Sequence, residues 1–592
     1  MRGISGTRTV MLNVFFLFFL GFFIVTLMNA QPSLPEKMVL QLDLTGELVE
    51  QVKRPEFGLS ALTAPAPRQV KVNDVVNALE RAAKDEAVLG VRLDLGELSR
   101  AALPHLQELR RAVEAFKESG KPVMAYADNF TQAQYYLAAT ADEVYIHPLG
   151  NIGLQGYAVY RNYIKDALDK LAIDVHVFRA GKYKSAAAPF IHNSMTDDER
   201  KANQAWLNTL WGVYTDDLFE MRGIEPERLQ YVLDNPALSI QKYEGDLGKL
   251  MLAEHWVDGL KYADEADAQL MQKTGEVDLV DFKTYLMASG SSIIPSQPKS
   301  DDNWVGIVFG SGQILHGDQP SGSIGSDTMV EQLNMALEDE RIKAVVLRLN
   351  TPGGSALASE SIRHAVDVLR AYGKPVVVSM GSMAASGGYW IASSADEIWA
   401  SPATITGSIG VFGIVPNISQ SLQKLGIHTD GLGTTKIAGS LRLDKPLAPE
   451  LAESIQLTID QIYKQFIGHV AQGRNMPVED VAELAQGRVW SGQDALELGL
   501  VDSLGGIDDA IKAAARLAGI AKDFEPIEVL PEQSPFELIL DNLLSEASAI
   551  LAPMQLSMLD SMFLSIKQHL TQVLMWNDPR GVYAISGVEL VQ

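Results

Sequence analysis

The sequence predicts an α/β protein made of two tandem βα repeats, each with a mostly parallel sheet covered by helices. Three observations support this prediction. The chain of 592 residues is too long for one hydrophobic core, two long stretches resemble each other at a fixed spacing, and each stretch alternates β-rich apolar runs with segments of helical spacing. Such alternation is typical of parallel sheets whose strands are connected by helices.

The repeat is clearest in two segments, QYYLAATADEVYIHP at residues 134–148 and GYWIASSADEIWASP at 388–402. Each has an aromatic pair, a small-residue helix, Ala-Asp-Glu and an apolar strand. The offset between them is 254 residues, and the same offset relates residues 169–178 to 423–432. A repeat of this length indicates a duplicated structural unit.

Within each unit, short apolar runs rich in β-branched residues predict strands. These strands are expected at residues 90–95, 121–127, 344–349 and 374–380. Two segments of helical spacing lie between them, at 104–120 and 359–373, and both end at glycine. We therefore expect an N-terminal repeat domain at 37–300 and a C-terminal repeat domain at 301–530, joined near PSQPKSDDN at 295–303.

The N-terminus predicts a membrane anchor. Residues 10–28 carry no charge and would span roughly 28 Å as a helix, close to the hydrocarbon thickness of a bilayer. Arg2 and Arg8 precede this run, so residues 1–9 are expected in the cytoplasm and the rest of the chain outside. The alternative is a cleaved signal peptide ending near Ala30, although the apolar run is longer than the usual signal core.

The segment after residue 530 is rich in Leu and Met at helical spacing, which predicts a C-terminal helical extension over 531–592. We expect these helices to pack on the two domains, with contact to the membrane or to another subunit as alternatives.

Composition excludes several classes of function. The net charge of −25 and the lack of a long basic run argue against nucleic acid as a partner. The chain has no cysteine, so disulfides, thiol catalysis and zinc–thiolate sites are excluded. No P-loop motif is present, so no ATP-driven unfolding is expected, and no cofactor or metal is indicated.

The stretch MAASGG suggests a nucleophile at Ser386, because a predicted strand precedes it and a predicted helix follows it. Such a turn presents a side chain outward and leaves backbone N–H groups free. The N–H of Gly353 or Gly354, in NTPGGS, and that of Gly387 could together form an oxyanion hole. The alternative is that the glycines mark a tight turn and that Ser386 only begins a helix.

The proton acceptor for such a serine is less clear from the sequence. His316, His364 and His428 lie in the same repeat, but no motif prefers one of them. The repeat suggests a lysine instead. Lys182 has a counterpart in the second copy, Lys436, whereas Lys184 has none. Conversely, Ser386 has no counterpart in the first copy, where Gln132 takes its position. This asymmetry suggests one active site divided between two diverged copies. A lysine can accept a proton only when its amine is neutral, which requires burial among apolar groups to lower its pKa. The alternative is that Lys184 is an ordinary solvated lysine in a loop.

Together these motifs resemble the S49 family of serine peptidases in its long, duplicated form. The likeness covers nearly the whole chain after the anchor. It is carried by FRAGKYKSAAAPF, LRLNTPGGSALASE, VVVSMGSMAASGGYWIAS and SPATITGSIGVFG, and by NDP at 577–579. The resemblance implies a fold of two crotonase/Clp-protease-like repeats.

For the site, the resemblance implies a Ser/Lys dyad with Ser386 as nucleophile and Lys184, not Lys182, as general base. Ser408, in TGSIG, would orient the lysine amine. The PGGS glycines would supply an oxyanion donor at Gly353 or Gly354.

The resemblance also implies a protein anchored in the bacterial inner membrane, with its catalytic domains in the periplasm. There it would degrade cleaved signal peptides, as a homotetramer. Two other functions remain open: an acyl-CoA enzyme of the crotonase type, which needs no serine nucleophile, and a membrane scaffold without activity.

Overall fold

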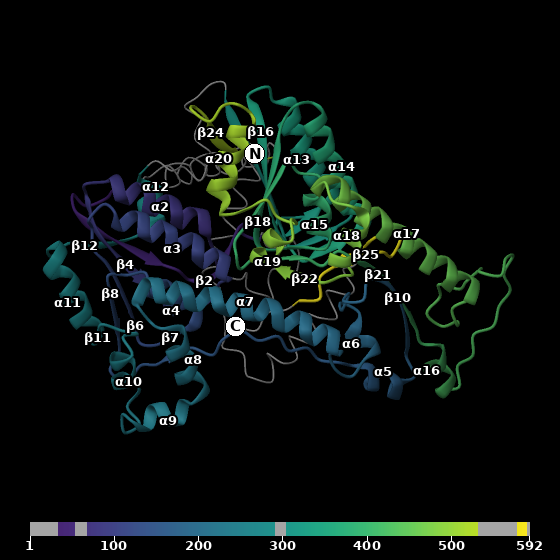
Figure 1. Cartoon of the computed structure of the whole chain (residues 1–592), viewed down its shortest axis with the longest axis horizontal. Helices are drawn as coiled ribbons and strands as arrows, with labels where there is room; N and C mark the ends of the chain where they lie inside the picture. Colours follow the sequence, from purple (N-terminus) through teal and green to yellow (C-terminus); the bar gives the residue numbers. More distant parts are fainter. Residues whose placement is uncertain (1–32, 54–67, 290–302, 531–576, 589–592) are drawn as a thin grey trace, which may run out of the picture.

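The structure is a computed structural model that describes residues 33–53, 68–289, 303–530 and 577–588 (Figure 1). The predicted anchor at 10–28 and nearly all of the joint at 295–303 lie outside these ranges. Among the residues described, no helix is both long and apolar enough to cross a membrane.

The first half contains a parallel six-stranded sheet. Its strands, in spatial order, are β11 (Gly259–Leu260), β8 (Glu143–Ile146), β6 (Val123–Ala127), β4 (Val88–Asp94), β1 (Met38–Asp43) and β12 (Asp278–Asp281). Side chains alternate across the sheet: Leu40 and Leu42 join the core with α2 (Val72–Lys84) and α3 (Leu103–Lys117), whereas Val39 packs on the α11 (Ala263–Thr274) side. Helices therefore cover both faces.

The second half repeats this arrangement in an eight-stranded sheet. Its main path is β22 (Val489–Ser491), β20 (Ile405–Gly407), β18 (Val376–Ala385), β16 (Ile342–Thr351), β13 (Trp304–Ser311) and β24 (Glu525–Glu528). Strand β19 (Glu397–Ala400) also pairs with β18, and β23 (Ser503–Leu504) pairs with β19. Only β22 is antiparallel to its neighbour. The helices α13 (Ser326–Glu338) and α14 (Ala356–Ala371) belong to the core on one face, and α20 (Ile507–Leu517) to the core on the other. The predicted mixed α/β architecture is confirmed, and β8 and β19 begin 254 residues apart.

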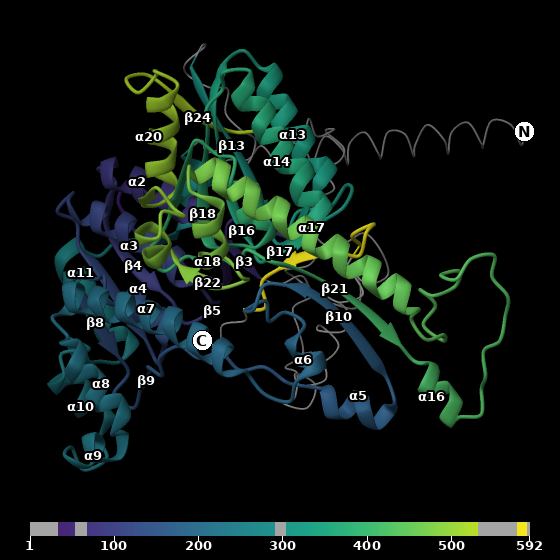
Figure 2. The same cartoon turned by 45° about the vertical axis from the view of Figure 1, so that its right-hand side comes forward.

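A third sheet connects the two halves. Its order is β10 (Asp174–Ala180), β21 (Val411–Asn417), β25 (Tyr583–Ile585), β17 (Gly353–Ser355), β14 (Gln313–Leu315) and β15 (Ser323–Gly325). The first-half strand β10 pairs antiparallel with the second-half strand β21 along seven residues. Figure 2 shows these two strands running together away from the body of the molecule.

The two copies have diverged after the helices α5 (Lys165–Leu171) and α16 (Ser419–Lys424), which lie 254 residues apart. The repeat offset relates β10 to residues 428–434, but those residues form no strand and are exposed. Strand β10 instead completes the sheet of the other copy. This exchange brings the loop after β10 to the second half.

The described part of the predicted C-terminal helical extension is not helical. Residues 577–588 contain β25, which lies between β17 and β21, and residues 531–576 lie outside the described ranges. A strand forms here because the neighbouring strands offer backbone hydrogen bonds on both sides and a buried apolar surface.

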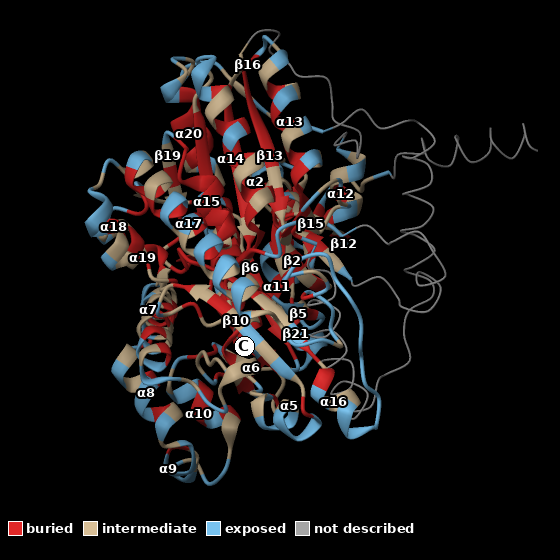
Figure 3. Cartoon of the chain, turned by 90° about the vertical axis from the view of Figure 1, so that its right-hand side faces the viewer, coloured by how far each residue is buried: buried red, intermediate tan, exposed pale blue. Residues whose placement is uncertain are grey.

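A buried ionic cluster lies where the two halves meet, within the mostly buried centre that Figure 3 shows in red. The Arg348 guanidinium, on β16, donates to Glu50 Oε1 (2.6 and 2.9 Å) and to Glu108 Oε1 (2.7 Å), both from the first half. Burial opposes ionisation of Glu50, but Arg348 and His105 outweigh it and lower the pKa of Glu50 to about 2. Burial raises the pKa of Glu108 despite Arg348. Arg348 is thus the cation that joins β16 to two carboxylates of the first half.

Arg348→Met should therefore lower the free energy of unfolding by about 3–5 kcal/mol near pH 8, because two carboxylates lose their cation inside the protein. The loss should shrink at pH 5, since buried carboxyl groups without a cation have raised pKa values and bind protons. Urea unfolding at both pH values measures this effect. Arg370→Met, which removes a more exposed ion pair to Asp396, is the control and should cost no more than about 1 kcal/mol. Equal losses in the two variants, or a loss independent of pH, would contradict the prediction.

Candidate active site

Ser386 lies at a sharp turn between β18 and the short helix α15 (Gly387–Ala392). Its backbone has φ 57° and ψ −109°, a conformation that costs a non-glycine residue about 1–3 kcal/mol. The turn is held because the Ser386 N–H donates to the Gly407 carbonyl at 2.8 Å. The surrounding structure thus fixes a strained turn that places the hydroxyl at the end of a parallel strand.

Lys184 comes from the first half, in the loop between β10 and α6 (Ala188–Ile191). Its side chain is only 1% exposed, although lysine is rarely buried. The Nζ atom lies 2.5 Å from Ser386 Oγ, 3.1 Å from Ser408 Oγ and 2.9 Å from the Ser408 carbonyl oxygen. The structure therefore brings together the three polar side chains that the sequence nominated.

Burial lowers the pKa of the Lys184 amine well below its usual value of 10.5. Its hydrogen-bond partners are hydroxyl and carbonyl oxygens, and no carboxylate opposes the effect of burial. A neutral amine in contact with a hydroxyl can accept its proton. The electrostatics of this pocket thus favour the form of lysine that can act as a base.

The other candidate bases lie elsewhere. Lys182 is 54% exposed and forms an ion pair with Asp198 at 3.0 Å, and the hydrogen bond to that carboxylate raises the pKa of Lys182. His316, His364 and His428 are all exposed, and none hydrogen-bonds to Ser386. Of the candidates weighed from the sequence, only Lys184 contacts the serine.

The lysine loop is held by a segment that the sequence analysis did not identify, residues 485–488. The Tyr183 N–H donates to the Gln486 carbonyl at 2.7 Å, and the Ser408 N–H donates to the Arg488 carbonyl at 2.6 Å. Gly487 has φ +78°, and a Cβ there would lie 2.7 Å from the Lys184 backbone nitrogen. One turn therefore positions both the base and its hydrogen-bond partner, and a glycine in an ordinary loop was the only sequence signal for it.

The predicted oxyanion glycines lie beside Ser386. Gly387 begins α15, so its N–H lies before the hydrogen bonding of the helix starts. Gly353 has φ +100°, and a Cβ there would stand 2.8 Å from the Gly387 nitrogen. The Gly353 N–H donates to Thr351 Oγ1 at 3.0 Å, and Gly354 pairs with Ala584 of β25, so the structure does not select one of the two as the second donor.

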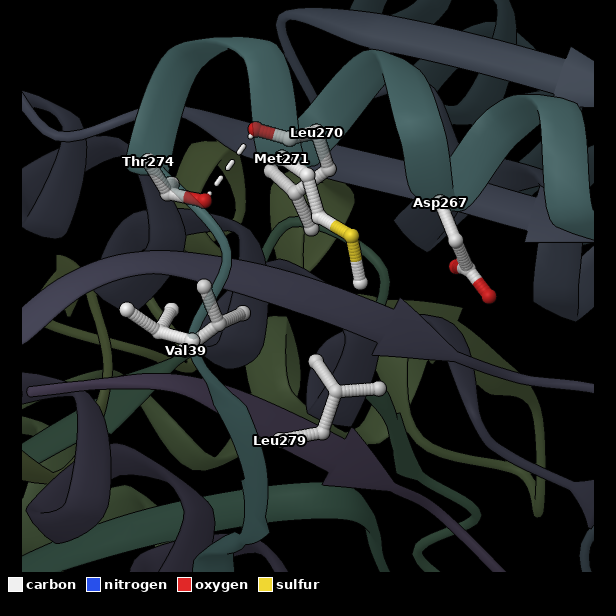
Figure 4. A pocket seen from close by; sticks show the side chains of 7 residues that line it. Val39, Asp267, Leu270, Met271, Thr274 and Leu279 are labelled. Carbon is white, nitrogen blue, oxygen red and sulfur yellow. Dashed lines mark hydrogen bonds between the residues drawn. The ribbon is translucent and has the colours of Figure 1, made fainter. Parts of the chain in front are cut away.

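Figure 4 shows a separate small cavity in the first half, between β1, α11 and β12. Its volume is about 10 Å³, enough for roughly one water molecule and not for a peptide. It is lined mainly by apolar side chains such as Val39 and Leu270. Within the part of the chain that the structure describes, no cluster of three or more His, Asp or Glu side chains could hold a metal ion. The Ser386 site is the stronger candidate for chemistry.

Comparison with known proteins identifies the family of the chain. The family model described as peptidase family S49 matches residues 115–277 and 369–521, whose first residues lie 254 positions apart, as in the internal repeat. The second match contains Ser386 and Ser408, and the first contains Lys184.

Several curated proteins are similar over most of the chain. Protease 4 of Salmonella typhi is 35% identical over 98% of this chain and 96% of its own length. Protease 4 of Haemophilus influenzae is 37% identical over 87% of this chain and 86% of its own. The chloroplastic serine protease SPPA of Arabidopsis thaliana is 30% identical over 81% of this chain and 69% of its own length.

Among solved structures, a ClpP1 mutant from Listeria monocytogenes matches 35% of this chain and 94% of its own, with 16% identity and a TM-score of 0.24, too low to support a structural conclusion. The family match and the full-length relatives are decisive without it: this chain belongs to peptidase family S49 and is a serine peptidase.

Proposed function

We propose that this peptidase is a membrane-anchored endopeptidase with a Ser386/Lys184 dyad. Its substrates would be cleaved signal peptides and other short apolar peptides on the periplasmic side of the bacterial inner membrane. The observation that carries the proposal is the 2.5 Å contact between a buried lysine amine and a serine hydroxyl on a strained turn. The homotetramer implied by family resemblance is part of the same proposal.

In the proposed reaction, Ser386 Oγ attacks the scissile carbonyl carbon while its proton passes to the neutral Lys184 Nζ. The oxygen of the tetrahedral intermediate accepts N–H groups from Gly387 and from Gly354 or Gly353. Collapse breaks the C–N bond, and the Lys184 ammonium returns the proton to the leaving amine. Water then attacks the acyl-enzyme and gives a proton to Nζ, and the regenerated hydroxyl recovers its proton from Nζ.

Ser408 acts as a positioning residue in this scheme. Its hydroxyl and carbonyl oxygens lie 3.1 and 2.9 Å from Nζ, so they orient the amine toward Ser386. Burial lowers the pKa of the amine, which favours the neutral form that the mechanism needs.

The apolar run at 10–28 and the two arginines before it support the anchor and its orientation. Peptide remnants of secretion are themselves apolar and remain in the membrane. A peptidase tethered at the bilayer surface would meet such substrates without an unfolding motor.

Ser386→Ala and Lys184→Ala should each reduce peptidase activity by about a thousandfold or more, because each removes one partner of a single proton-transfer step. Lys182→Ala should retain most of the activity, since Lys182 pairs with Asp198 at the surface. A digest of apolar peptides with products read by mass tests all three variants. A serine-directed acylating inhibitor should label the wild type at Ser386. Full activity in Lys184→Ala would remove the dyad, and labelling at another serine would show that Ser386 is not the nucleophile.

The pH dependence should report the lowered pKa of Lys184. The base works only when neutral, so kcat/KM should rise with pH through that pKa and level off above it. The midpoint should lie well below 10.5. Circular dichroism at each pH separates this rise from unfolding. A rise that begins only near 10.5 would show that the amine is not desolvated in solution.

The anchor can be tested in spheroplasts that express the full chain. The protein should remain with the membrane after carbonate extraction, and added protease should digest it from outside. The double substitution Phe18→Arg and Phe22→Arg should release it, because each central arginine costs about 2.5–3.5 kcal/mol in insertion. Protection of the wild-type catalytic domains in intact spheroplasts would reverse the proposed orientation.

A further inference from the structure

The chain's own strand β25 (Tyr583–Ile585) lies between β17 and β21 in the third sheet (Figure 2). Strand β25 is antiparallel to both: Ala584 pairs with Gly354, and Tyr583 with Phe412. The Ser586 N–H donates to the Pro352 carbonyl at 2.6 Å. The C-terminal segment thus occupies a slot bordered by backbone groups on both sides.

This strand passes directly over the candidate oxyanion hole. The Ala584 carbonyl oxygen lies 2.1 Å from the place a Cβ would take on Gly353, and 3.2 Å from that of a Cβ on Gly387. Only glycine at 353 permits this approach. Further on, a Cβ at Gly587 would stand 2.9 Å from Ala186 Cα, in the loop that carries Lys184. A peptide backbone in this slot therefore runs past the candidate oxyanion glycines and reaches the loop that carries Lys184.

The side chains of β25 alternate between two kinds of surroundings. Tyr583 and Ile585 pack in one apolar cluster with Phe412 and with Ala187 of the lysine loop. Ala584 points the opposite way and is 0% exposed, so no larger side chain fits there without movement. The slot suits an extended peptide with a small residue between two apolar ones.

The residues before β25 make hydrogen bonds of their own to the second half. Asn577 exchanges two hydrogen bonds of 2.9 Å with the His316 backbone, and Asp578 accepts hydrogen bonds from the Ser355 hydroxyl and the Leu357 N–H. These contacts lie before the strand. They keep residues 582–586 at a high effective concentration beside the slot even when the strand has left it.

We propose that peptide substrates bind in this slot as an added β-strand and that β25 is their intramolecular competitor, which must leave before a peptide reaches Ser386. The proposal rests on the proposed function and extends it to the class of peptide and to its control. The hydrogen bonds that β25 now makes would be made by the substrate backbone, as in other proteins that recognise peptides by strand addition.

Hydrogen exchange on the full-length Ser386→Ala chain tests the competition, because this variant should hold a peptide without cutting it. The probe is the peptide GVYAISGV, the sequence of residues 581–588. With the peptide bound, as measured by fluorescence anisotropy, the amides of Tyr583, Ala584 and Ile585 should exchange about tenfold faster or more. Unchanged protection of these amides in the peptide complex would overturn the proposal.

Kinetics of a full-length variant give a second measure. Ala584→Lys places a long side chain where none fits, so β25 should leave the slot and KM for apolar peptides should fall about tenfold with kcat unchanged. Ala584→Ser is the matched control and should keep the wild-type KM. An Ala584→Lys variant that folds cooperatively and keeps the wild-type KM would overturn the proposal. So would a folded variant that does not bind GVYAISGV. If the variant does not fold, the exchange experiment decides.

The two proposals fail separately. A chain that cleaves peptides through Ser386 but keeps β25 protected would refute only the slot. A chain whose β25 is displaced by peptide but whose Ser386→Ala variant matches the wild-type rate of cleavage would refute only the dyad.

Discussion

The contact between Lys184 Nζ and Ser386 Oγ depends on a lysine that is buried without a counter-charge. Burial lowers its pKa, so the folded protein holds this proton less tightly than the unfolded chain does. The unfolded state therefore binds more protons in the window between the lowered pKa and 10.5, and folding stability rises with pH across that window. Below that window the full cost remains. The pairing of β10 with β21 and the turn at 485–488 must offset that cost, and the strained turn at Ser386 adds to it.

Duplication explains how one chain can hold such a pair. A single repeat has one strand–turn–helix, and the first copy has Gln132 where the second has Ser386. Gln132 Oε1 accepts the N–H groups of Gln155 and Gly156, and the Tyr214 hydroxyl donates to its carbonyl oxygen. The equivalent turn in the first copy is thus used to hold its own loops. That copy contributes β10 and the lysine loop, whereas the matching segment of the second copy forms no strand. The halves are complementary, and the buried Arg348 cluster lies between them.

Sequence reasoning reached the parts of this structure that depend on local pattern. Alternation of apolar runs and helical segments predicted β4, β6, β16, β18, α3 and α14, and the repeat asymmetry singled out Lys184 and Ser386. The sequence analysis did not predict the pairing of β10 with β21. That analysis relied on the internal repeat, and this pairing has no counterpart in the other copy. The turn at Gln486 and Gly487 was missed because it acts through backbone contacts with the lysine loop. Such contacts leave no pattern of side chains in the sequence. The described end of the C-terminal segment was wrongly expected to be helical, since the partners that make Tyr583–Ile585 a strand lie more than 160 residues away.

The position of β25 also bears on how this fold protects itself. Without it, β17 and β21 would each expose an unpaired edge beside a reactive serine, and such edges recruit other chains. In this structure β25 satisfies both edges, and Asn577 and Asp578 hold the residues that precede it. Exchange with a substrate strand replaces one set of backbone hydrogen bonds by another, so its free energy depends mainly on the side chains and on tether entropy. A peptide with the small and apolar residues that the slot accepts can compete, whereas a folded protein surface cannot offer a free strand. Selectivity for short, unfolded, apolar peptides would then follow from the occupant that they displace.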